Sequence, residues 1–136
     1  MSVVCHGSLR AAASLPFEFR ILRIVDGLAE ILQTNAPQEA ALEDLFHSVN
    51  PRSALQLAHM RGALVLELTR RGIPLFTYAS RAVKKAVTGT GAAKKDQVRA
   101  MVERLLKLSL GRHPLDVSDA LAIAICHAHS RRGRQA

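Results

Sequence analysis

The chain has 136 residues, of which 49% are hydrophobic, and its formal net charge is +8. This length suits one domain with a real core, and we expect a single domain over 1–136, because so apolar a chain is not expected to be disordered. No apolar run reaches the ~20 residues of a membrane span, and we expect no secretory signal, because the N-terminus has no sustained apolar stretch. The two cysteines, Cys5 and Cys126, lie far apart in sequence and suggest a reducing compartment with no disulfide framework. We therefore expect a cytoplasmic protein with no membrane partner.

The first predicted elements are a helix and a short strand. Apolar residues recur with helical spacing from Phe19 to Leu32, and Pro37 lies just beyond the expected end of this helix. The segment "EAALEDLF" (39–46) is short, apolar and preceded by a proline turn. It predicts a buried strand that carries Glu43 near its end. The predicted helical stripe consists of Phe19, Leu22, Val25, Leu28 and Leu32.

A second helix is predicted from Asn50 to Arg71. Asn50 is a good N-cap, Pro51 suits the first helical position, and Gly72 suits the residue after the end. Gly62 inside this helix costs about 1 kcal/mol relative to alanine. Either a neighbouring helix approaches closely there, or the position is a tolerated weak point. The segment "IPLFTY" (73–78) then predicts a second strand.

The last third of the chain is predicted to be helical and basic. Ser80 is expected to cap a short helix through Val87, "TGTG" (88–91) breaks it, and "AAKKDQVRAMVERLLKL" (92–108) resumes helix. Val98, Met101, Leu105 and Leu108 lie on one side of this predicted helix. A final helix and a basic tail at 130–136 follow. Because strands and helices alternate along the chain, the fold class is predicted to be α/β.

Positive charge is concentrated in one segment. Residues 1–78 carry seven basic and seven acidic side chains, whereas 79–113 carry nine basic residues against Asp96 and Glu103, a balance of +7. Such a block favours a polyanion site over an inconsequential basic surface. The lysines considered for nucleic-acid contact are Lys84, Lys85, Lys94 and Lys95. "GTG" before a helix is a weak phosphate-loop signal, since it matches neither the Walker nor the Rossmann pattern.

Three carboxylates are candidates for a metal site. Asp116 and Asp119 lie three residues apart at the start of the last helix, so they share one helix face. Taken alone, the pair is explained better as a helix cap and a favourable first-turn charge. With Glu43 at a strand end, the three acids could converge, and like charges at close range require a cation such as Mg²⁺. His127 and His129 are two apart on a helix, so a zinc site is not expected.

The combined motifs identify a family resemblance. "RAVKKAVTGTGAAKKDQVRAMVERLLKL" (81–108) followed by "DVSDALAIAICHAH" (116–129) resembles the C-terminal half of the RuvC Holliday junction resolvases, and "ALEDLFHSVNPRSALQLAHMRGALVLEL" (41–68) resembles their middle. The likeness runs from about Gly7 to His129. It implies an RNase H-like α/β fold with a mixed sheet flanked by helices. It also implies a homodimeric endonuclease that uses two Mg²⁺ ions, or Mn²⁺, to nick four-way DNA junctions in recombination and repair, with RuvA and RuvB as partners.

The resemblance also implies roles for particular residues. Glu43, Asp116 and Asp119 match the family's catalytic metal-binding acids, and Phe46 matches an aromatic residue that inserts at the junction's base stack. Lys84 and Lys95 match its DNA-contacting lysines. The helix from Asn50 to Arg71 corresponds to the family's dimerisation helix. The close approach of a neighbouring helix in a dimer would explain the glycine at position 62.

One departure from the family pattern is large. The family begins with two strands, the first ending in an Ile-Asp-x-Gly turn whose aspartate is a metal ligand, whereas here "VVCHGSLRA" (3–11) resembles the third strand. We therefore expect an N-terminally truncated fold, with weak junction binding and negligible cleavage by these 136 residues. The alternative function is a catalytically inactive junction-binding remnant or a truncated gene product. A third class, an RNA-binding or ribosomal accessory protein, explains the charge but not the acids.

Overall fold

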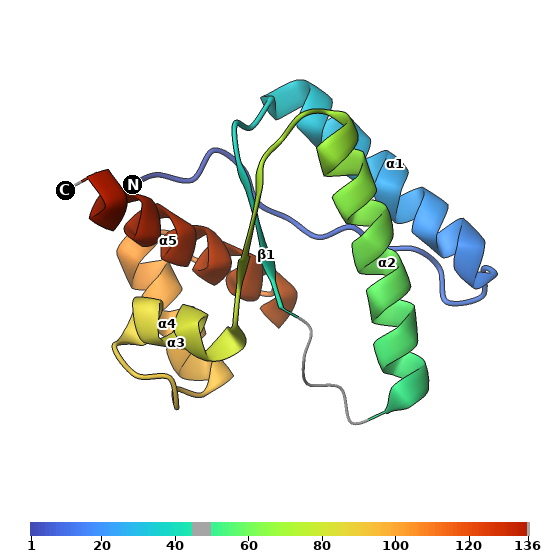
Figure 1. The fold of residues 1–136 in the computed structure, drawn as a ribbon. Coiled ribbons are helices and arrows are strands. Elements are labelled where there is room, and N and C mark those ends of the chain that lie inside the picture. Colours follow the sequence, from blue (N-terminus) through green and yellow to red (C-terminus); the bar gives the residue numbers. More distant parts are fainter. Residues whose placement is uncertain (45–49, 136) are drawn as a thin grey trace. The chain divides into compact units, whose positions relative to one another are not determined.

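The computed structural model describes residues 1–44 and 50–135 (Figure 1). The α/β class is confirmed, and each helix predicted from the sequence is present with ends shifted by a few residues. The segment predicted to be a basic tail continues the last helix as far as Gln135. In chain order the elements are α1 (Phe17–Asn35), β1 (Ala40–Glu43), α2 (Pro51–Arg70), β2 (Leu75–Tyr78), α3 (Ser80–Thr88), α4 (Lys95–Leu106) and α5 (Leu115–Gln135).

The described residues divide into two compact units. The three-helix unit comprises residues 1–8, 41–44 and 77–135, and contains α3, α4 and α5. The two-helix unit comprises residues 9–40 and 50–76, and contains α1 and α2. Each unit is described by itself below.

The strands β1 and β2 form a two-stranded sheet. The Ala40 N–H donates to the Pro74 carbonyl and the Asp44 N–H donates to the Tyr78 carbonyl, both at 2.9 Å. The two bonds are four residues apart in the same direction on both strands, so the pair is parallel. A mixed sheet was expected, and the described residues contain this parallel pair alone.

The prediction of a strand over residues 3–11 is wrong. In the structure this segment has a bend at Val4 and belongs to no strand. A strand is defined by ladder hydrogen bonds to a neighbour, and the sheet of the described residues contains β1 and β2 without this segment. Apolar and β-branched residues are therefore not sufficient here to make "VVCHGSLRA" a strand.

The two-helix unit is built by packing α1 against α2. Asn50 caps α2 as predicted, since its side-chain oxygen accepts hydrogen bonds from the Arg52 and Ser53 N–H groups at 3.0 and 3.4 Å. The helix predicted from the apolar spacing between Phe19 and Leu32 is confirmed as α1, although Phe19 and Leu22 near its start are about half exposed. Gly62 is exposed, and outside its own helical backbone no atom of the described residues lies within 4 Å of the position that its Cβ would take, so no other described helix approaches it.

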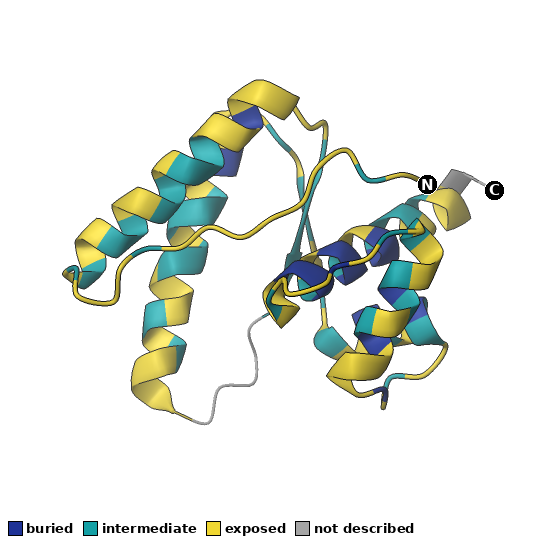
Figure 2. Cartoon of the chain, turned by 180° about the vertical axis from the view of Figure 1, so that it is seen from behind, coloured by how far each residue is buried: buried dark blue, intermediate teal, exposed yellow. Residues whose placement is uncertain are grey.

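The three-helix unit contains the main hydrophobic core. Helices α3, α4 and α5 pack against one another, and Figure 2 shows the buried residues concentrated on α5 and the helices beside it. On α4 the buried side carries Val102 where the sequence suggested Leu105, which is partly exposed. The most deeply buried side chains are those of Val102, Leu110, Val117, Ser118 and Ile125.

None of the helices in the described part of the chain is both long enough and apolar enough to cross a membrane.

Candidate functional site

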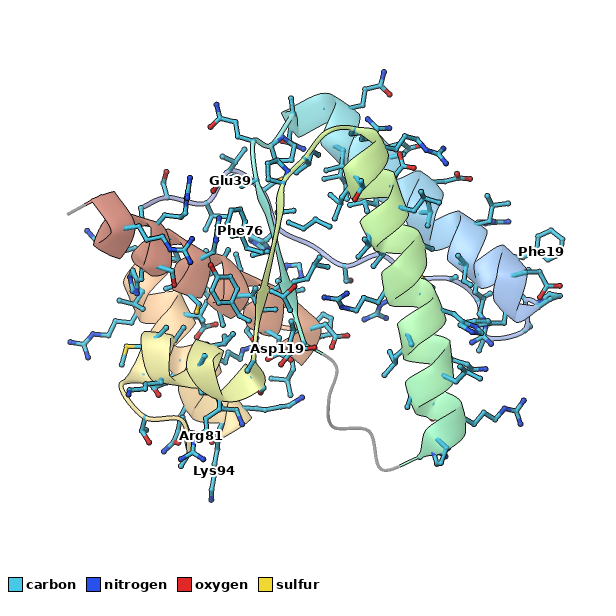
Figure 3. The ribbon with its side chains drawn as sticks, viewed as in Figure 1. Phe19, Glu39, Phe76, Arg81, Lys94 and Asp119 are labelled. Atoms are coloured by element: carbon cyan, nitrogen blue, oxygen red, sulfur yellow. The ribbon has the colours of Figure 1, made fainter. Side chains whose placement is uncertain are left out.

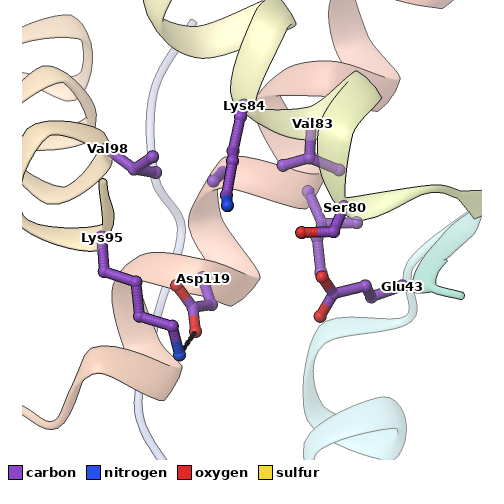
Figure 4. A pocket seen from close by; sticks show the side chains of 9 residues that line it. Glu43, Ser80, Val83, Lys84, Lys95, Val98 and Asp119 are labelled. Carbon is purple, nitrogen blue, oxygen red and sulfur yellow. Dashed lines mark ion pairs between the residues drawn. The ribbon is translucent and has the colours of Figure 1, made fainter. Parts of the chain in front are cut away.

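A pocket in the three-helix unit brings acids and lysines together. It has a volume of about 100 Å³ and lies among the end of β1, the start of α3, the start of α4 and the second turn of α5. Its floor is formed by core side chains, including Val83, Val98 and Ala122. Figure 4 shows four charged head groups turned toward the same space. The polar side chains that line the pocket are those of Glu43, Ser80, Lys84, Lys95 and Asp119.

Glu43 reaches the pocket because it is the last residue of β1. The next residue, Asp44, donates its N–H to the carbonyl of Tyr78 at the end of β2. This hydrogen bond fixes the point where β1 leaves the sheet. Ser80 begins α3 two residues after Tyr78, so the parallel pair delivers both polar side chains to one edge. Side chains at the ends of parallel strands are a common source of functional groups in α/β folds.

Asp119 is positioned by the connection between α4 and α5. The Arg99 guanidinium donates to the carbonyls of Gly111 and His113, and the Glu103 carboxylate accepts the Leu110 N–H at 2.8 Å. These bonds hold the turn that precedes α5. The neighbours of Asp119 on either side, Ser118 and Ala120, differ sharply in burial, because Ser118 is fully buried. Asp119 therefore sits at the edge of the core, half-buried, with its carboxylate at the pocket.

Asp116 does not share this pocket. It is exposed on the first turn of α5, and it is not the N-cap, because the helix already begins at Leu115. The cap interpretation is therefore wrong in detail, although a carboxylate in the first turn is favourable for the helix dipole. Among residues 1–44 and 50–135, no group of three or more His, Cys, Asp or Glu side chains is arranged to hold a metal ion.

The carboxylates of the pocket still fit a divalent cation. Mg²⁺ is often bound through one or two carboxylates, with water and phosphate oxygens as its other ligands. Glu43 and Asp119 supply two such carboxylates at one pocket, and the hydroxyl of Ser80 is a third oxygen-bearing group that lines it. This donor set contains hard oxygen atoms and no sulfur or imidazole, which favours Mg²⁺ or Mn²⁺ over zinc.

The four candidate lysines separate into two pairs. Lys84 and Lys95 line the pocket, and the Lys95 Nζ lies 3.7 Å from the Asp119 Oδ2. Lys85 and Lys94 are exposed and do not line it. In Figure 3 the side chain of Lys94 extends away from Asp119 into solvent. Phe46, the predicted stacking residue, lies outside the described residues.

The "TGTG" segment is not an open phosphate-binding loop. The Thr88 hydroxyl donates to the Lys84 carbonyl at 2.8 Å, and it accepts the Thr90 N–H at 3.3 Å, while the Thr90 hydroxyl accepts the Ala92 N–H at 3.2 Å. These bonds use N–H groups that a phosphate would need. Gly91 packs against Arg81 so closely that a Cβ would lie 2.5 Å from the Arg81 Cγ.

Two residues make contacts that the sequence did not indicate. Ser80 was expected to cap α3, but the N-cap position is Ala79, and Ser80 lines the pocket instead. His127 forms a hydrogen bond with the hydroxyl of Tyr78, 2.7 Å from its Nδ1. These residues are 49 positions apart, so no local pattern could have paired them. The bond ties the end of β2 to α5, which also carries Asp119.

Comparisons with known proteins agree with the resemblance seen in the sequence. Residues 1–127 match the family model described as crossover junction endodeoxyribonuclease RuvC. The RuvC protein of Maricaulis maris is 43% identical over 132 residues, which cover 97% of this chain and 78% of that protein. The RuvC protein of Koribacter versatilis is 45% identical over 127 residues, which cover 93% of this chain and 76% of that protein.

Solved structures show the same fold. The structure of Thermus thermophilus RuvC in complex with a Holliday junction substrate matches with a TM-score of 0.86 and 31% identity, covering 95% of this chain and 79% of that one. A second Thermus thermophilus RuvC structure matches with a TM-score of 0.79 and 29% identity, covering 91% of this chain and 73% of that one.

Proposed function

Because the chain belongs to the RuvC family of crossover junction endodeoxyribonucleases, we propose that it resolves Holliday junctions by metal-dependent hydrolysis of DNA phosphodiester bonds. One observation carries the proposal: the family match extends over residues 1–127, and the residues inside it form a pocket with two carboxylates and two lysines. Carboxylates that bind a cation, next to ammonium groups that bind phosphate, are the parts that phosphodiester hydrolysis requires.

In this proposal Glu43 and Asp119 hold a divalent cation at the pocket. Membership of this nuclease family implies a divalent metal, and we assign it as Mg²⁺, with Mn²⁺ as a substitute and two ions in the active site. A bound cation of this kind stabilises charge on the phosphate oxygens and lowers the pKa of coordinated water. Asp116 lies three residues from Asp119 on α5, and we assign it to the same catalytic set.

The lysines are assigned to the DNA backbone. Lys84 and Lys95 would contact phosphates at the scissile position, while Lys85 and Lys94 would contact phosphates farther along the strands. Phosphate contacts release counterions, so the affinity for junction DNA is expected to fall steeply with salt. Phe46 is assigned to stacking on a base at the junction centre, which is worth about 1–3 kcal/mol per base. Phe46→Ala should then weaken junction cleavage and leave duplex binding nearly unchanged.

The two-helix unit is assigned to homodimerisation. Leu55 and Leu66 on α2 are more than half exposed, and Gly62 between them has open space at its Cβ position. Exposed apolar side chains with a small residue between them suit the packing of a second helix. A symmetric dimer would present two sites to two like strands of a junction. The assignment of RuvA and RuvB as partners is supported by the family resemblance alone.

Nicking of a synthetic four-way junction tests the proposal. The purified chain should bind the junction in preference to a linear duplex of the same sequence, and should nick two like strands when Mg²⁺ is present. Weak junction binding with negligible nicking would instead support the outcome expected from the sequence alone. Asp119→Asn should remove nicking and preserve junction binding, because it removes one carboxylate charge without changing the side-chain size. Equal nicking of junction and duplex would contradict junction selectivity.

The alternative, an inactive junction-binding protein, gives a different result in the same assay. It predicts selective junction binding with no nicking in Mg²⁺ or Mn²⁺, and no difference between the original chain and Asp119→Asn. The relatives that match this chain over most of its length are named as endonucleases. This favours the active enzyme over the inactive alternative.

A further inference from the structure

The charges that line the pocket cancel before any cation is added. Glu43 and Asp119 contribute two negative charges, and Lys84 and Lys95 contribute two positive charges. The Lys95 ammonium forms an ion pair with the Asp119 carboxylate, with 3.7 Å between Nζ and Oδ2 (Figure 4). Lys84 makes no ion pair with any carboxylate of the described residues. One lysine is therefore already bound to one of the acids that the proposed cation needs.

The pair between Lys95 and Asp119 is easily exchanged. The side chain of Lys95 is 66% exposed and that of Asp119 is 33% exposed. Ion pairs this open to solvent contribute little to stability, because water screens the charges and two side chains must be held in place. Lys95 is the first residue of α4, so its backbone is fixed by the helix while its long side chain can reach more than one acceptor.

A divalent cation and the Lys95 ammonium compete for the carboxylate of Asp119. Two positive charges at contact distance from one carboxylate repel each other, so each lowers the affinity of the other. A DNA phosphate offers the released ammonium a new anionic partner. Binding of phosphate by Lys95 therefore removes the competitor of the cation, and by linkage the bound cation must favour DNA to the same degree.

We propose that Lys95 is an exchangeable counter-ion that neutralises Asp119 in the metal-free protein and moves to a DNA phosphate when a divalent cation binds. The inference rests on the proposed function and adds a regulatory step to the same site. It makes metal binding and DNA binding mutually reinforcing. The protein then holds its cation weakly without DNA and more tightly at a phosphodiester, which limits cleavage to bound substrate.

Lys94 provides a matched control. It is adjacent in sequence, carries the same charge and side chain, is exposed like Lys95 and is also assigned to DNA, but it does not line the pocket. Its backbone N–H is bound to the Gln97 Oε1 at 2.8 Å, a bond that a side-chain substitution does not remove. Lys94→Met and Lys95→Met therefore remove the same charge from neighbouring positions, one outside the pocket and one inside it.

The first measurement is Mn²⁺ binding to the DNA-free protein, followed by electron paramagnetic resonance at constant ionic strength. Lys95→Met should bind Mn²⁺ about two- to fivefold more tightly than the original chain, the range expected on removal of an exposed ion pair. Lys94→Met should change the affinity by less than about 1.5-fold, because salt screens charges that are farther from the site. Both variants should bind junction DNA more weakly.

The second measurement is junction affinity with and without Ca²⁺ as a divalent probe. The original chain and Lys94→Met should both bind the junction more tightly when Ca²⁺ is present, and Lys95→Met should lose most of that gain. Unchanged Mn²⁺ affinity in Lys95→Met, or an equal rise in Lys94→Met, would overturn the exchange even if the chain nicks junctions. Absence of Mn²⁺ binding by every variant would overturn both the exchange and the metal assignment of the proposed function.

Discussion

The two units of the chain differ in how well they bury their apolar residues. In the three-helix unit, residues from α3, α4, α5 and the connecting loops form one buried cluster. In the described part of the two-helix unit, Leu32 and Leu68 are the buried apolar residues, and several large ones on α1 and α2 are about half exposed (Figure 2). One unit has a core of its own, whereas the other consists of two helices with a thin contact.

The difference indicates where rigidity and where association are expected. The side chains of the candidate site are attached to the well-packed unit, because β1, α3, α4 and α5 all supply pocket residues there. Functional groups are held most accurately on elements whose positions are set by a core. Exposed apolar faces on the two-helix unit are typical of a surface that another molecule covers. The predictions below test this contrast.

The largest expected effect is a loss of stability when a cavity is made in the core of the three-helix unit. Leu110 is 1% exposed, and Leu110→Ala should lower the free energy of unfolding by about 2–5 kcal/mol, since it leaves a cavity in a packed region. Leu105→Ala makes the same change at a partly exposed position of the same unit and should cost about 0.5 kcal/mol. Urea unfolding followed by circular dichroism measures both. A cost for Leu55→Ala as large as that for Leu110→Ala would contradict the contrast between the units.

A smaller effect is expected on association through the two-helix unit. Leu66 is 57% exposed in the chain, and Leu66→Glu should raise the dimer dissociation constant by about tenfold or more, as loss of a buried interface anchor does. Leu105→Glu on the three-helix unit is the control, and it should leave the dimer intact. Sedimentation velocity measures the distribution of monomer and dimer. If Leu66→Glu sediments as a dimer like the original chain, α2 is not the interface.

The smallest effect concerns helix caps in the two units. Asn50 caps α2 with its side chain, and Asn50→Ala should cost about 1 kcal/mol. Ala79, at the N-cap of α3, has an extended backbone and no side-chain cap, so Ala79→Ser should stabilise by a comparable amount. Hydrogen exchange resolved by unit is the measurement. Asn50→Ala should raise the rate of hydrogen exchange on α2, and Ala79→Ser should lower the rate on α3. If either substitution changed exchange equally in both units, the units would unfold together, which would contradict the contrast between them.

The sequence predicted the elements better than it predicted which faces are buried. Helical spacing, Asn50 and Gly72 located α2 correctly, because caps and positive φ angles depend on the residue itself and its near neighbours. On α4 the apolar side read from the sequence includes Leu105, which is partly exposed, and leaves out Val102, which is fully buried. On α1, Phe19 and Leu22 have the predicted helical spacing but are about half exposed. Periodicity identifies an amphipathic face, but the neighbouring element decides which part of it is covered.

The candidate site shows the same division. The family resemblance assigned Glu43, Asp116 and Asp119 together, and in the structure Glu43 and Asp119 line one pocket while Asp116 is exposed on the preceding turn. The roles of these residues, of the lysines and of Phe46 remain predictions. The pairing of Lys95 with Asp119 was not anticipated, because residues 24 positions apart meet through the packing of α4 on α5.

By itself, the sequence determined the α/β class, the approximate bounds of its helices and strands, the basic block and the family, because these depend on local propensity, charge and motif spacing. The tertiary structure decided that residues 3–11 form no strand, that Ser80 lines the pocket, and that Lys95 pairs with Asp119. The physical reason is that strand pairing, burial and ion pairs require two segments to meet. The amino-acid sequence specifies the chemistry of each segment. The free energy of a contact between two segments depends on how the helices pack.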